Sequence, residues 1–458
     1  MHIRKYDVDY SRRHFLDQLR RGVLATGVLA PLWPTLSRSG EIAGVYPEEL
    51  LSIDAYTKGR IATGATIDAG NVELVKDLLD PIRYHQVAQM GRRMEVIDTT
   101  RDAFQLSPWE YIEATLRNQG QAMFDADGNV VTRAGKPWIG GNPFPDPKTA
   151  IEVFAGITLT WGRRDASFYV IKEYDIGPEG KVEYQYDLCW AELAPVGRTV
   201  LEPKPYWTGH EDKLRYQSVF FVSPNDIKGT SFLNVWPYDQ REFPDLMGYI
   251  PAFKRVRRFP TNQRFEPLIP GSSLYLSDAW TAGDPFLTWG NYRIVGRGPT
   301  LAGISRNWNS AHENWEHGTH GGPLGNTFWD MKVELVPEAI VIDAEPVRFP
   351  KAPISRKRVW FDARTLAPLM MVSFDRRGEI FRSFDGAGAV YSDGANTVLD
   401  GAHPYVSWTH VHAHNIQTNR MTRLEQVREI SGGYRMSANA PDLYERYLTQ
   451  AALRRLGS

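Results

Sequence analysis

Residues 357–384 read KRVWFDARTLAPLMMVSFDRRGEIFRSF, three short apolar runs separated by two turn signals. Runs of four to eight apolar and β-branched residues between turns predict strands. The three predicted strands are Lys357–Phe361, Leu369–Phe374 and Ile380–Phe384. The segments between them, Asp362–Thr365 and Asp375–Gly378, have the composition of hairpin turns, since Asp and Gly favour tight backbone reversals. This stretch therefore predicts an antiparallel meander.

The same strand signal extends over most of the chain after residue 150. In Val182–Trp190, apolar residues alternate with Glu183, Gln185, Asp187 and Cys189. A period of two predicts a half-buried antiparallel strand with one apolar and one mostly polar face. Three further strands are predicted: Phe168–Tyr174, Leu214–Val222 and Phe328–Val336. We therefore expect an α+β protein dominated by β-structure, with a single β domain at residues 151–430.

The regions on either side of this β domain have a different pattern. Residues 41–150 are predicted to be helical and looped and to pack on the sheet. Within them, Asn71–Leu79 has helical spacing and is stopped by Asp80 and Pro81. Ser107 followed by Pro108 predicts the N-cap of a second helix that continues to Leu116. Residues 431–458 are expected to form a C-terminal helix or tail.

The N-terminus carries a targeting signal. Residues 11–16, SRRHFL, resemble the twin-arginine export signal, with Arg12 and Arg13 as its arginine pair. The apolar stretch at 22–33 is shorter than the roughly 20 residues that span a bilayer. Residues 1–40 are therefore predicted to be a signal segment that brings the folded chain through the twin-arginine translocase to the periplasm. The alternative interpretation is a basic amphipathic helix of the mature protein.

Composition restricts the function. The chain has 53 Lys and Arg against 54 Asp and Glu, a net charge of -1, so a nucleic-acid partner is not expected. Cys189 is the single cysteine, which leaves no internal disulfide and no cysteine metal site. With 14 Trp, 21 Tyr and 20 Phe, the sequence fits an apolar cavity, a sugar-binding cleft or an ordinary β-rich core.

Four segments, in order along residues 140–385, resemble one bacterial family, the domain of unknown function 1329 family, whose members are often described as outer-membrane lipoprotein-sorting-like. They are Gly141–Pro147 with Glu152 and Val153 after it, Phe253–Pro260, Asp278–Trp280 leading to Trp289–Gly296, and Arg356–Asp362. The resemblance fades before residue 70 and after residue 400. Residues 307–325 also differ from the family pattern, because they are unusually rich in His and Gly.

The resemblance implies the fold of the periplasmic lipoprotein carrier and receptor: a strongly curved antiparallel sheet, an unclosed half-barrel, with helices lidding an apolar cavity on its concave face. It implies a lipid-like or other hydrophobic ligand, and a partner among export pumps of the resistance–nodulation–division type. Aromatic side chains on the concave face are then the expected ligand contacts: Trp161, Tyr169, Tyr184, Tyr186 and Trp190. A carrier of this kind needs no catalytic residue and no cofactor.

Two histidine groups keep an enzyme open as an alternative. His410, His412 and His414 would share one face of a strand, and His-x-His pairs are able to ligate a divalent metal. His312, His317 and His320 lie with Glu313 and Glu316 in a Gly-rich loop. If the two groups met, they would form the site of a metal-dependent hydrolase. The simpler interpretation of the first group is a polar, solvent-facing strand edge, and that of the second is a surface loop whose histidines bind nothing.

The remaining observations favour no enzyme class. A Gly-x-Ser-x-Gly nucleophile elbow is absent from the sequence. The basic run Lys254–Arg258 is interpreted either as a contact for lipid phosphates or as a solvated face. A ligand-free accessory subunit of an export complex is the third hypothesis for this chain.

Overall fold

The computed structural model of the chain describes residues 46–260, 263–267, 269, 271–278, 284–305, 312–393 and 396–457. The predicted signal segment at 1–40, with Arg12 and Arg13, lies outside the described residues. Among the helices that are described, none is both long enough and apolar enough to cross a membrane.

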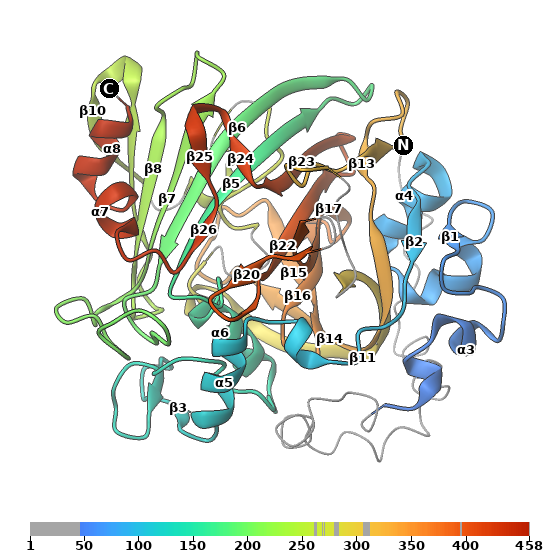
Figure 1. Cartoon of the computed structure of the whole chain (residues 1–458), viewed down its shortest axis with the longest axis horizontal. Coiled ribbons are helices and arrows are strands. Elements are labelled where there is room, and N and C mark those ends of the chain that lie inside the picture. The colour runs from blue at the N-terminus through green and yellow to red at the C-terminus, as the bar shows by residue number, and fades with distance from the viewer. Residues whose placement is uncertain are drawn as a thin grey trace.

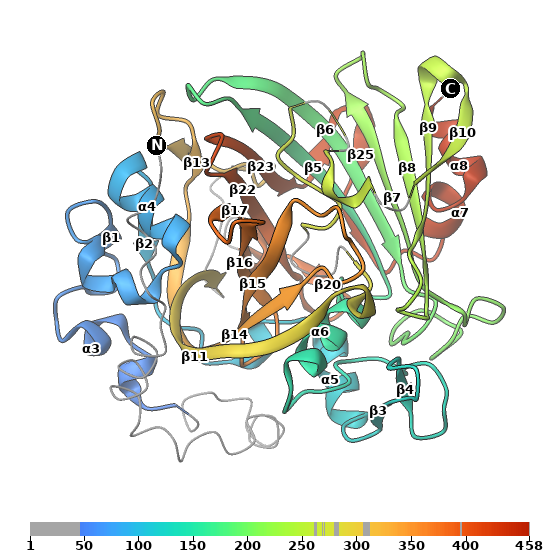
Figure 2. The same cartoon turned by 180° about the vertical axis from the view of Figure 1, so that it is seen from behind.

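One large sheet organises the described part of the chain (Figures 1 and 2). It has 16 strands, and its main path runs β1-β2-β14-β15-β16-β17-β22-β23-β5-β6-β7-β8-β9-β10. β11 and β26 pair with strands of this path without extending it. The path ends in two different strands, β1 and β10, so the sheet is not closed into a barrel. The sheet strands are β1 Thr66–Ile67, β2 Met94–Val96, β5 Ala166–Ile176, β6 Val182–Leu193, β7 Lys213–Ser223, β8 Ser231–Pro237, β9 Asp245–Ile250, β10 Arg255–Phe259, β11 Gly290–Ser305, β14 Lys332–Glu345, β15 Ile354–Asp362, β16 Pro368–Asp375, β17 Ile380–Val390, β22 Val406–Asn415, β23 Arg420–Val427 and β26 Ser437–Ala438.

The meander predicted at residues 357–384 is present as β15, β16 and β17, paired antiparallel in that order. Both predicted turns join them. At the second, the Asp375 carboxylate accepts hydrogen bonds from the backbone N–H groups of Arg377 and Glu379, at 2.9 and 3.0 Å. Gly378 has a φ of 79°, a left-handed conformation that favours glycine. The strand predicted at Phe328–Val336 is wrong in its extent, because it divides into the short β13, Phe328–Trp329, and the start of β14.

The sheet is mixed rather than purely antiparallel, which corrects one part of the expectation. The end of β11, Gly303–Ser305, pairs parallel with Ala387–Ala389 of β17, and β14 pairs parallel with β2. Gly303 permits the first pairing because a Cβ there would lie 2.8 Å from the Cβ of Ala387. The remaining pairings of the path are antiparallel.

The two faces of β5, β6 and β7 are covered by different elements. Phe168, Val170 and Cys189 point to one face, where they pack with the C-terminal helices α7, Leu443–Tyr447, and α8, Gln450–Leu456. Tyr169 and Ile171 alternate with these residues and point to the other face. The face of β6 predicted to be mostly polar is therefore buried around Cys189, which is fully covered.

Helix α6, Ala150–Leu159, lies on the inner side of the curved sheet, between the β5–β10 half and the β14–β16 half (Figure 1). It begins with a capping box, in which Thr149 and Glu152 exchange hydrogen bonds with the backbone. Phe154 and Ile157 of this helix pack in one core cluster with residues of β14 to β17 and β22, among them Phe361 and Val411. This helix therefore fills one part of the concave side.

The N-terminal part lies against the outer side of β11 and β14. Its main helix is α4, Pro81–Met90, whose first turn is capped by the Asp80 carboxylate. The helix predicted at Asn71–Leu79 is a 3-10 helix, η4 Val72–Leu78, kinked at Val75, and it ends where predicted. The second predicted helix is α5, Trp109–Arg117, but the prediction of Ser107 as its N-cap is wrong. Pro108 occupies the cap position, and the Ser107 hydroxyl accepts a hydrogen bond from Arg163 instead.

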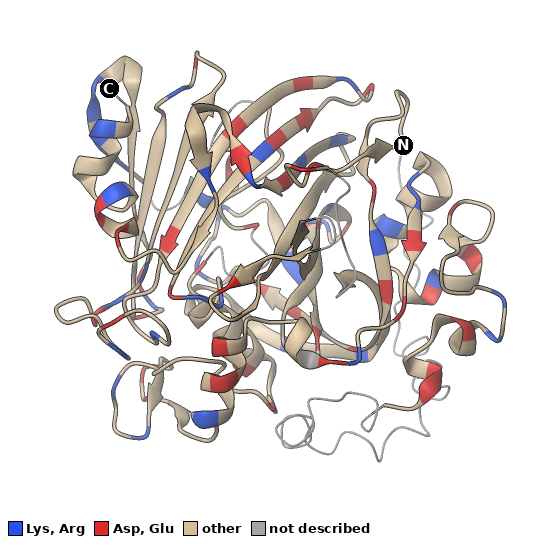
Figure 3. Ribbon diagram, viewed as in Figure 1, with Lys and Arg blue, Asp and Glu red and all other residues tan. Residues whose placement is uncertain are grey.

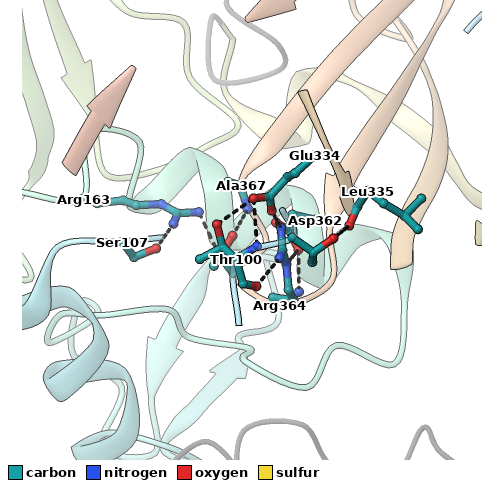
Figure 4. A network of polar contacts seen from close by, with 10 residues as sticks. Thr100, Ser107, Arg163, Glu334, Leu335, Asp362, Arg364 and Ala367 are labelled. Atoms are coloured by element: carbon teal, nitrogen blue, oxygen red, sulfur yellow. Dashed lines mark hydrogen bonds and ion pairs between the residues drawn. The ribbon is translucent and has the colours of Figure 1, made fainter. Parts of the chain in front are cut away.

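A buried polar network holds the segment between β2 and α5 to the sheet (Figure 4). Arg364 is fully buried and donates to Asp362, to Glu334 and, at 3.0 Å, to the backbone carbonyl of Thr100. Glu334 in turn accepts from the backbone N–H and the hydroxyl of Thr100, at 2.9 and 2.6 Å. The network fixes the polypeptide that leads to residues 105–108, at one side of the concave face.

Candidate ligand cavity

A cavity of about 280 Å³ lies on the concave face beside α6. Residues of one face of β5, β6 and β7 line it together with residues of β17, β22 and β23. Since β7 and β17 are separated by four strands in the sheet, one cavity touches both only because the sheet curves around it. The volume lies just below the range of roughly 300–1,000 Å³ found for small-molecule sites.

The strand register explains the apolar wall. Tyr169 of β5 is opposite Trp190 of β6, which is opposite Val219 of β7. The next row of the same face is Ile171, Leu188 and Phe221. All six side chains line the cavity, as the period of two requires for one sheet face.

The cavity is closed on its other sides by non-strand elements. Ile157 of α6 and the segment from Gln105 to Pro108 contribute to one side. Arg264, Ile269, Ser272 and residues 274–276 contribute to another. The helical lid expected from the resemblance is thus supplied by α6 with loop segments, while α7 and α8 lie on the opposite face of the sheet.

Of the five predicted ligand contacts, Trp161, Tyr169 and Trp190 line the cavity. Tyr186 is buried nearby and packs edge-on to Phe221, with ring centroids 5.8 Å apart. Tyr184 lies farther along β6, is 42% exposed, and stacks on Tyr186 at 6.1 Å. The structure therefore places three of the five side chains in the cavity wall, while Tyr184 and Tyr186 lie outside it.

Several lining residues were not predicted. Ile171 and Leu188 lie two residues from predicted contacts in predicted strands, and the period of two was the signal that would have found them. Val219 and Phe221 also lie in a predicted strand, but no contact was predicted there, and the register with β6 places them in the wall. Trp408, Val411 and Leu424 come from β22 and β23, strands whose cavity face was not assigned. Arg164, a charged lining residue, lies in the turn between α6 and β5.

Few charged side chains interrupt the apolar wall, and Glu173 and Arg264 among them are buried. Glu173 accepts a hydrogen bond from Ser272 at 2.9 Å, and burial, followed by repulsion from Asp175, raises its pKa well above the ordinary value. Glu192 lies next to Tyr169 and Trp190. Its carboxylate accepts hydrogen bonds from the Tyr169 hydroxyl at 3.4 Å and from Trp190 Nε1 at 3.3 Å. Burial raises the pKa of Glu192 too, while the charge of Arg215 opposes this shift.

A smaller polar chamber of about 50 Å³ adjoins the cavity. Residues Trp161 to Arg164 line both spaces. The chamber is further lined by Asp165, Glu192 and Arg215. The combined site is therefore an apolar pocket with one charged extension.

The predicted histidine strand is β22, but its histidines face away from the cavity. His410, His412 and His414 alternate with Val411 and Ala413, which belong to the core cluster around α6. Each imidazole is 1% exposed, and burial lowers its pKa. They lie beneath the N-terminal part and the β12–β13 hairpin, Thr319–His320 and Phe328–Trp329.

These imidazoles make protein contacts rather than a common centre. His412 Nε2 accepts from the backbone N–H of Trp329 at 2.9 Å, and His414 Nδ1 lies 3.0 Å from Gln86 Nε2. The second group approaches the first at His317, whose ring centroid is 4.6 Å from that of His410. His320 pairs with Asp330, and the side chain of His312 is 55% exposed.

Among the described residues, no group of three His, Cys, Asp or Glu side chains has an arrangement that could hold a metal ion. The arrangement therefore gives no support to the hydrolase alternative.

The basic run Lys254–Arg258 overlaps β10, the edge strand of the sheet. Arg255, Arg257 and Arg258 are exposed, and Arg258 lies 3.5 Å from Asp245 of the neighbouring strand. Charged residues on an edge strand prevent unwanted strand pairing. Elsewhere, Lys and Arg are interspersed with Asp and Glu, as Figure 3 shows in one view.

An unclosed, strongly curved sheet with an apolar cavity on its concave face defines this protein as a half-barrel with a hydrophobic pocket. The model of the family described as Protein of unknown function (DUF1329) matches residues 66–454. The chain belongs to this family. The match extends on both sides beyond the segments that carried the resemblance.

Solved structures similar to the chain include the following three. A putative outer membrane lipoprotein-sorting protein domain from Vibrio parahaemolyticus is 17% identical, with a TM-score of 0.39, over 64% of this chain and 92% of that one. A DUF1329 family protein from Desulfovibrio piger is 13% identical, with a TM-score of 0.43, over 66% and 97%. A LolA superfamily protein from Nitrosomonas europaea is 12% identical, with a TM-score of 0.35, over 67% and 100%. These scores are too low to carry an inference about what this chain binds. A search of curated proteins gave no match.

Proposed function

We propose that this protein is a periplasmic carrier or receptor for a lipid-like or other hydrophobic ligand, which it holds in the concave-face cavity. The observation that carries the proposal is the cavity itself. Helix α6 fills the neighbouring part of the concave side, yet a cavity of about 280 Å³ remains beside it and is lined mainly by apolar side chains. Apolar cavities of this kind stay dry and take up apolar molecules.

The binding energy would come from burial of alkyl groups, at about 0.8 kcal/mol for each CH₂. Trp161, Tyr169 and Trp190 supply large rigid surfaces at one end of the pocket. The proposal includes no catalytic residue and no cofactor. Its cellular part rests on the sequence: Arg12 and Arg13 for twin-arginine export, and the family resemblance for a partnership with an envelope export system.

The test is a fluorescence titration of the purified full chain with N-phenyl-1-naphthylamine, a neutral apolar dye. Val219 is the cross-strand neighbour of Trp190 in the cavity wall, so Val219→Trp would fill part of the cavity with protein atoms. Val347 is 53% exposed and lies outside the cavity, which makes Val347→Trp the matched control. We expect saturable binding to the wild type and to Val347→Trp, and at least about tenfold weaker binding to Val219→Trp.

Two results would contradict the proposal. One is the absence of saturable dye binding to the wild type. The other is equal binding to both tryptophan variants, provided that circular dichroism shows the Val219→Trp chain to be folded. The export part has its own test: Arg12→Lys with Arg13→Lys should keep the chain in the cytoplasm, and its arrival in the periplasm would refute the twin-arginine route.

A further inference from the structure

Arg164 is the charged residue that distinguishes one end of the cavity. It lies between α6 and β5, its side chain is 3% exposed, and it lines both the apolar cavity and the polar chamber. Its Nε donates to Asp400 at 2.7 Å, and its guanidinium carbon lies 4.5 Å from the centroid of the Tyr405 ring. One side of this guanidinium is therefore held firmly by the protein.

One terminal nitrogen of the guanidinium lacks a partner in the described part of the chain. Arg164 Nη2 is buried and has no hydrogen-bond partner among the described residues. The neighbouring Arg163 differs, because it donates to Ser107 and, at 3.0 Å, to the backbone carbonyl of Thr365. A buried charged donor without an acceptor is costly, so a ligand that brings an acceptor would gain from the contact.

The acidic groups near this site are already engaged. Asp165 accepts from the backbone N–H groups of Thr199, Val200 and Leu201 at 2.7–3.0 Å. Glu192 lies within hydrogen-bond distance of Trp190 and Tyr169. Asp400 binds Arg164 through Nε and not through Nη2. The chamber therefore presents a free donor, whereas its carboxylates have donors of their own.

Chemistry and size together define the group that would fit. Arginine offers donors only, and its strong partners are carboxylate and phosphate oxygens. The chamber of about 50 Å³ has room for one small group, since a water molecule occupies roughly 30 Å³ of liquid. The adjoining apolar cavity suits a hydrocarbon chain.

We propose that Arg164 anchors the anionic oxygen head group, carboxylate or phosphate, of a single-chain amphiphile whose hydrocarbon chain occupies the cavity. This inference rests on the proposed function and narrows its ligand class. The guanidinium is pre-positioned by Asp400 and Tyr405, so the head group would receive a charge-assisted hydrogen bond from Nη2.

The experiment measures displacement of N-phenyl-1-naphthylamine from the full chain by dodecanoic acid, dodecyl phosphate and dodecan-1-ol at pH 8. The variants are Arg164→Met and a matched control, Arg198→Met. Arg198 is also buried, lies 5.8 Å from the Trp207 ring centroid and has an unpartnered Nε, but it lines neither space.

The wild type should bind an anionic amphiphile more tightly than the alcohol, and Arg164→Met should weaken that amphiphile about tenfold or more, as expected for a charged hydrogen bond. Arg164→Met should change the affinity for the dye and for the alcohol by less than about threefold. Arg198→Met should change the affinity for each of these ligands by less than about threefold. A preference for the acid or for the phosphate identifies the head group. Equal affinity of the wild type for acid, phosphate and alcohol would overturn the inference even if Arg164→Met did not fold.

The two proposals fail in different ways. If the dye does not bind the wild type, the proposed function fails. If the dye binds but the anionic amphiphiles lose no affinity in folded Arg164→Met, or lose it together with the alcohol, the head-group inference fails alone.

Discussion

Replacing Arg364 by methionine should destabilise the protein strongly. The Arg364 side chain is 0% exposed, and its Nη2 lies 2.8 Å from both Glu334 and Asp362. Its Nε contacts Asp362 again, at 2.9 and 3.1 Å. Arg364→Met removes the only cation that these buried groups contact in the network of Figure 4, so two carboxylates lose their counter-charge. Breaking a buried ion pair from one side costs about 3–5 kcal/mol.

Arg241→Met is the matched control, because it has the same local arrangement at the surface. Arg241 follows Asp239 by two residues, as Arg364 follows Asp362, and donates to it through Nε and Nη2 at 2.6–3.1 Å. Its side chain is 46% exposed, however, and water replaces the lost contact. We expect no measurable change in stability for this variant.

The assay is urea denaturation of the full chain, followed by tryptophan fluorescence at pH 7.5. Domains are typically stable by about 5–15 kcal/mol, so the predicted loss would lower the midpoint clearly. Adding Glu334→Gln to Arg364→Met should recover part of the loss, since one uncompensated carboxylate is removed. A loss for Arg364→Met within about 1 kcal/mol of the wild type would refute the inference that this network holds residues 100–108 to the sheet.

Three further outcomes are expected. Burial raises the pKa of Asp175 to about 7, above the ordinary 3.8, so the folded state keeps a proton that the unfolded state releases, and stability falls as pH rises from about 4 to 7. Asp175→Asn should reduce the dependence of the unfolding free energy on pH by about 1.4 kcal/mol for each pH unit. The same dependence on pH in the variant and the wild type, measured by urea titration, would contradict this prediction. Burial lowers the pKa of His414 from 6.5 to about 4, so the protein loses stability as the pH drops from 6.5 to about 4. His414→Gln should make this loss of stability less steep in the same assay. An equally steep loss would count against a buried neutral imidazole at this position. Gly141 has a φ of 71°, and a Cβ there would lie 2.6 Å from the backbone of α5, whereas Gly135, at 70°, has open space. Gly135→Ala should cost about 1–2 kcal/mol and Gly141→Ala clearly more, and equal costs in thermal melts would refute the close approach.

The sequence predicted the local elements better than their surroundings. The meander at 357–384 was predictable because short-range signals, apolar runs and Asp-containing turns, specify it. The period of two in β6 was also correct, yet its polar face around Cys189 is buried. That burial depends on α7 and α8, more than 250 residues later in the chain, and no local pattern encodes it.

The candidate site was predictable only in part for the same reason. Tyr169 and Trp190 are opposite each other in the register, and their alternation placed both on one face. Tyr184 has the same periodicity but lies beyond the cavity, because the length of the cavity is set by the elements that cross it. Arg164 carried no pattern in the sequence, since its significance comes from its burial and from the missing partner of its Nη2.

Native mass spectrometry of the chain, purified from the periplasm without detergent, tests the central claim most directly. The account predicts that the wild type and Val347→Trp each carry an apolar small molecule, about one per chain, and that Val219→Trp does not. A wild-type chain that stays empty after exposure to envelope lipids, or a Val219→Trp chain that is loaded equally, would contradict the account.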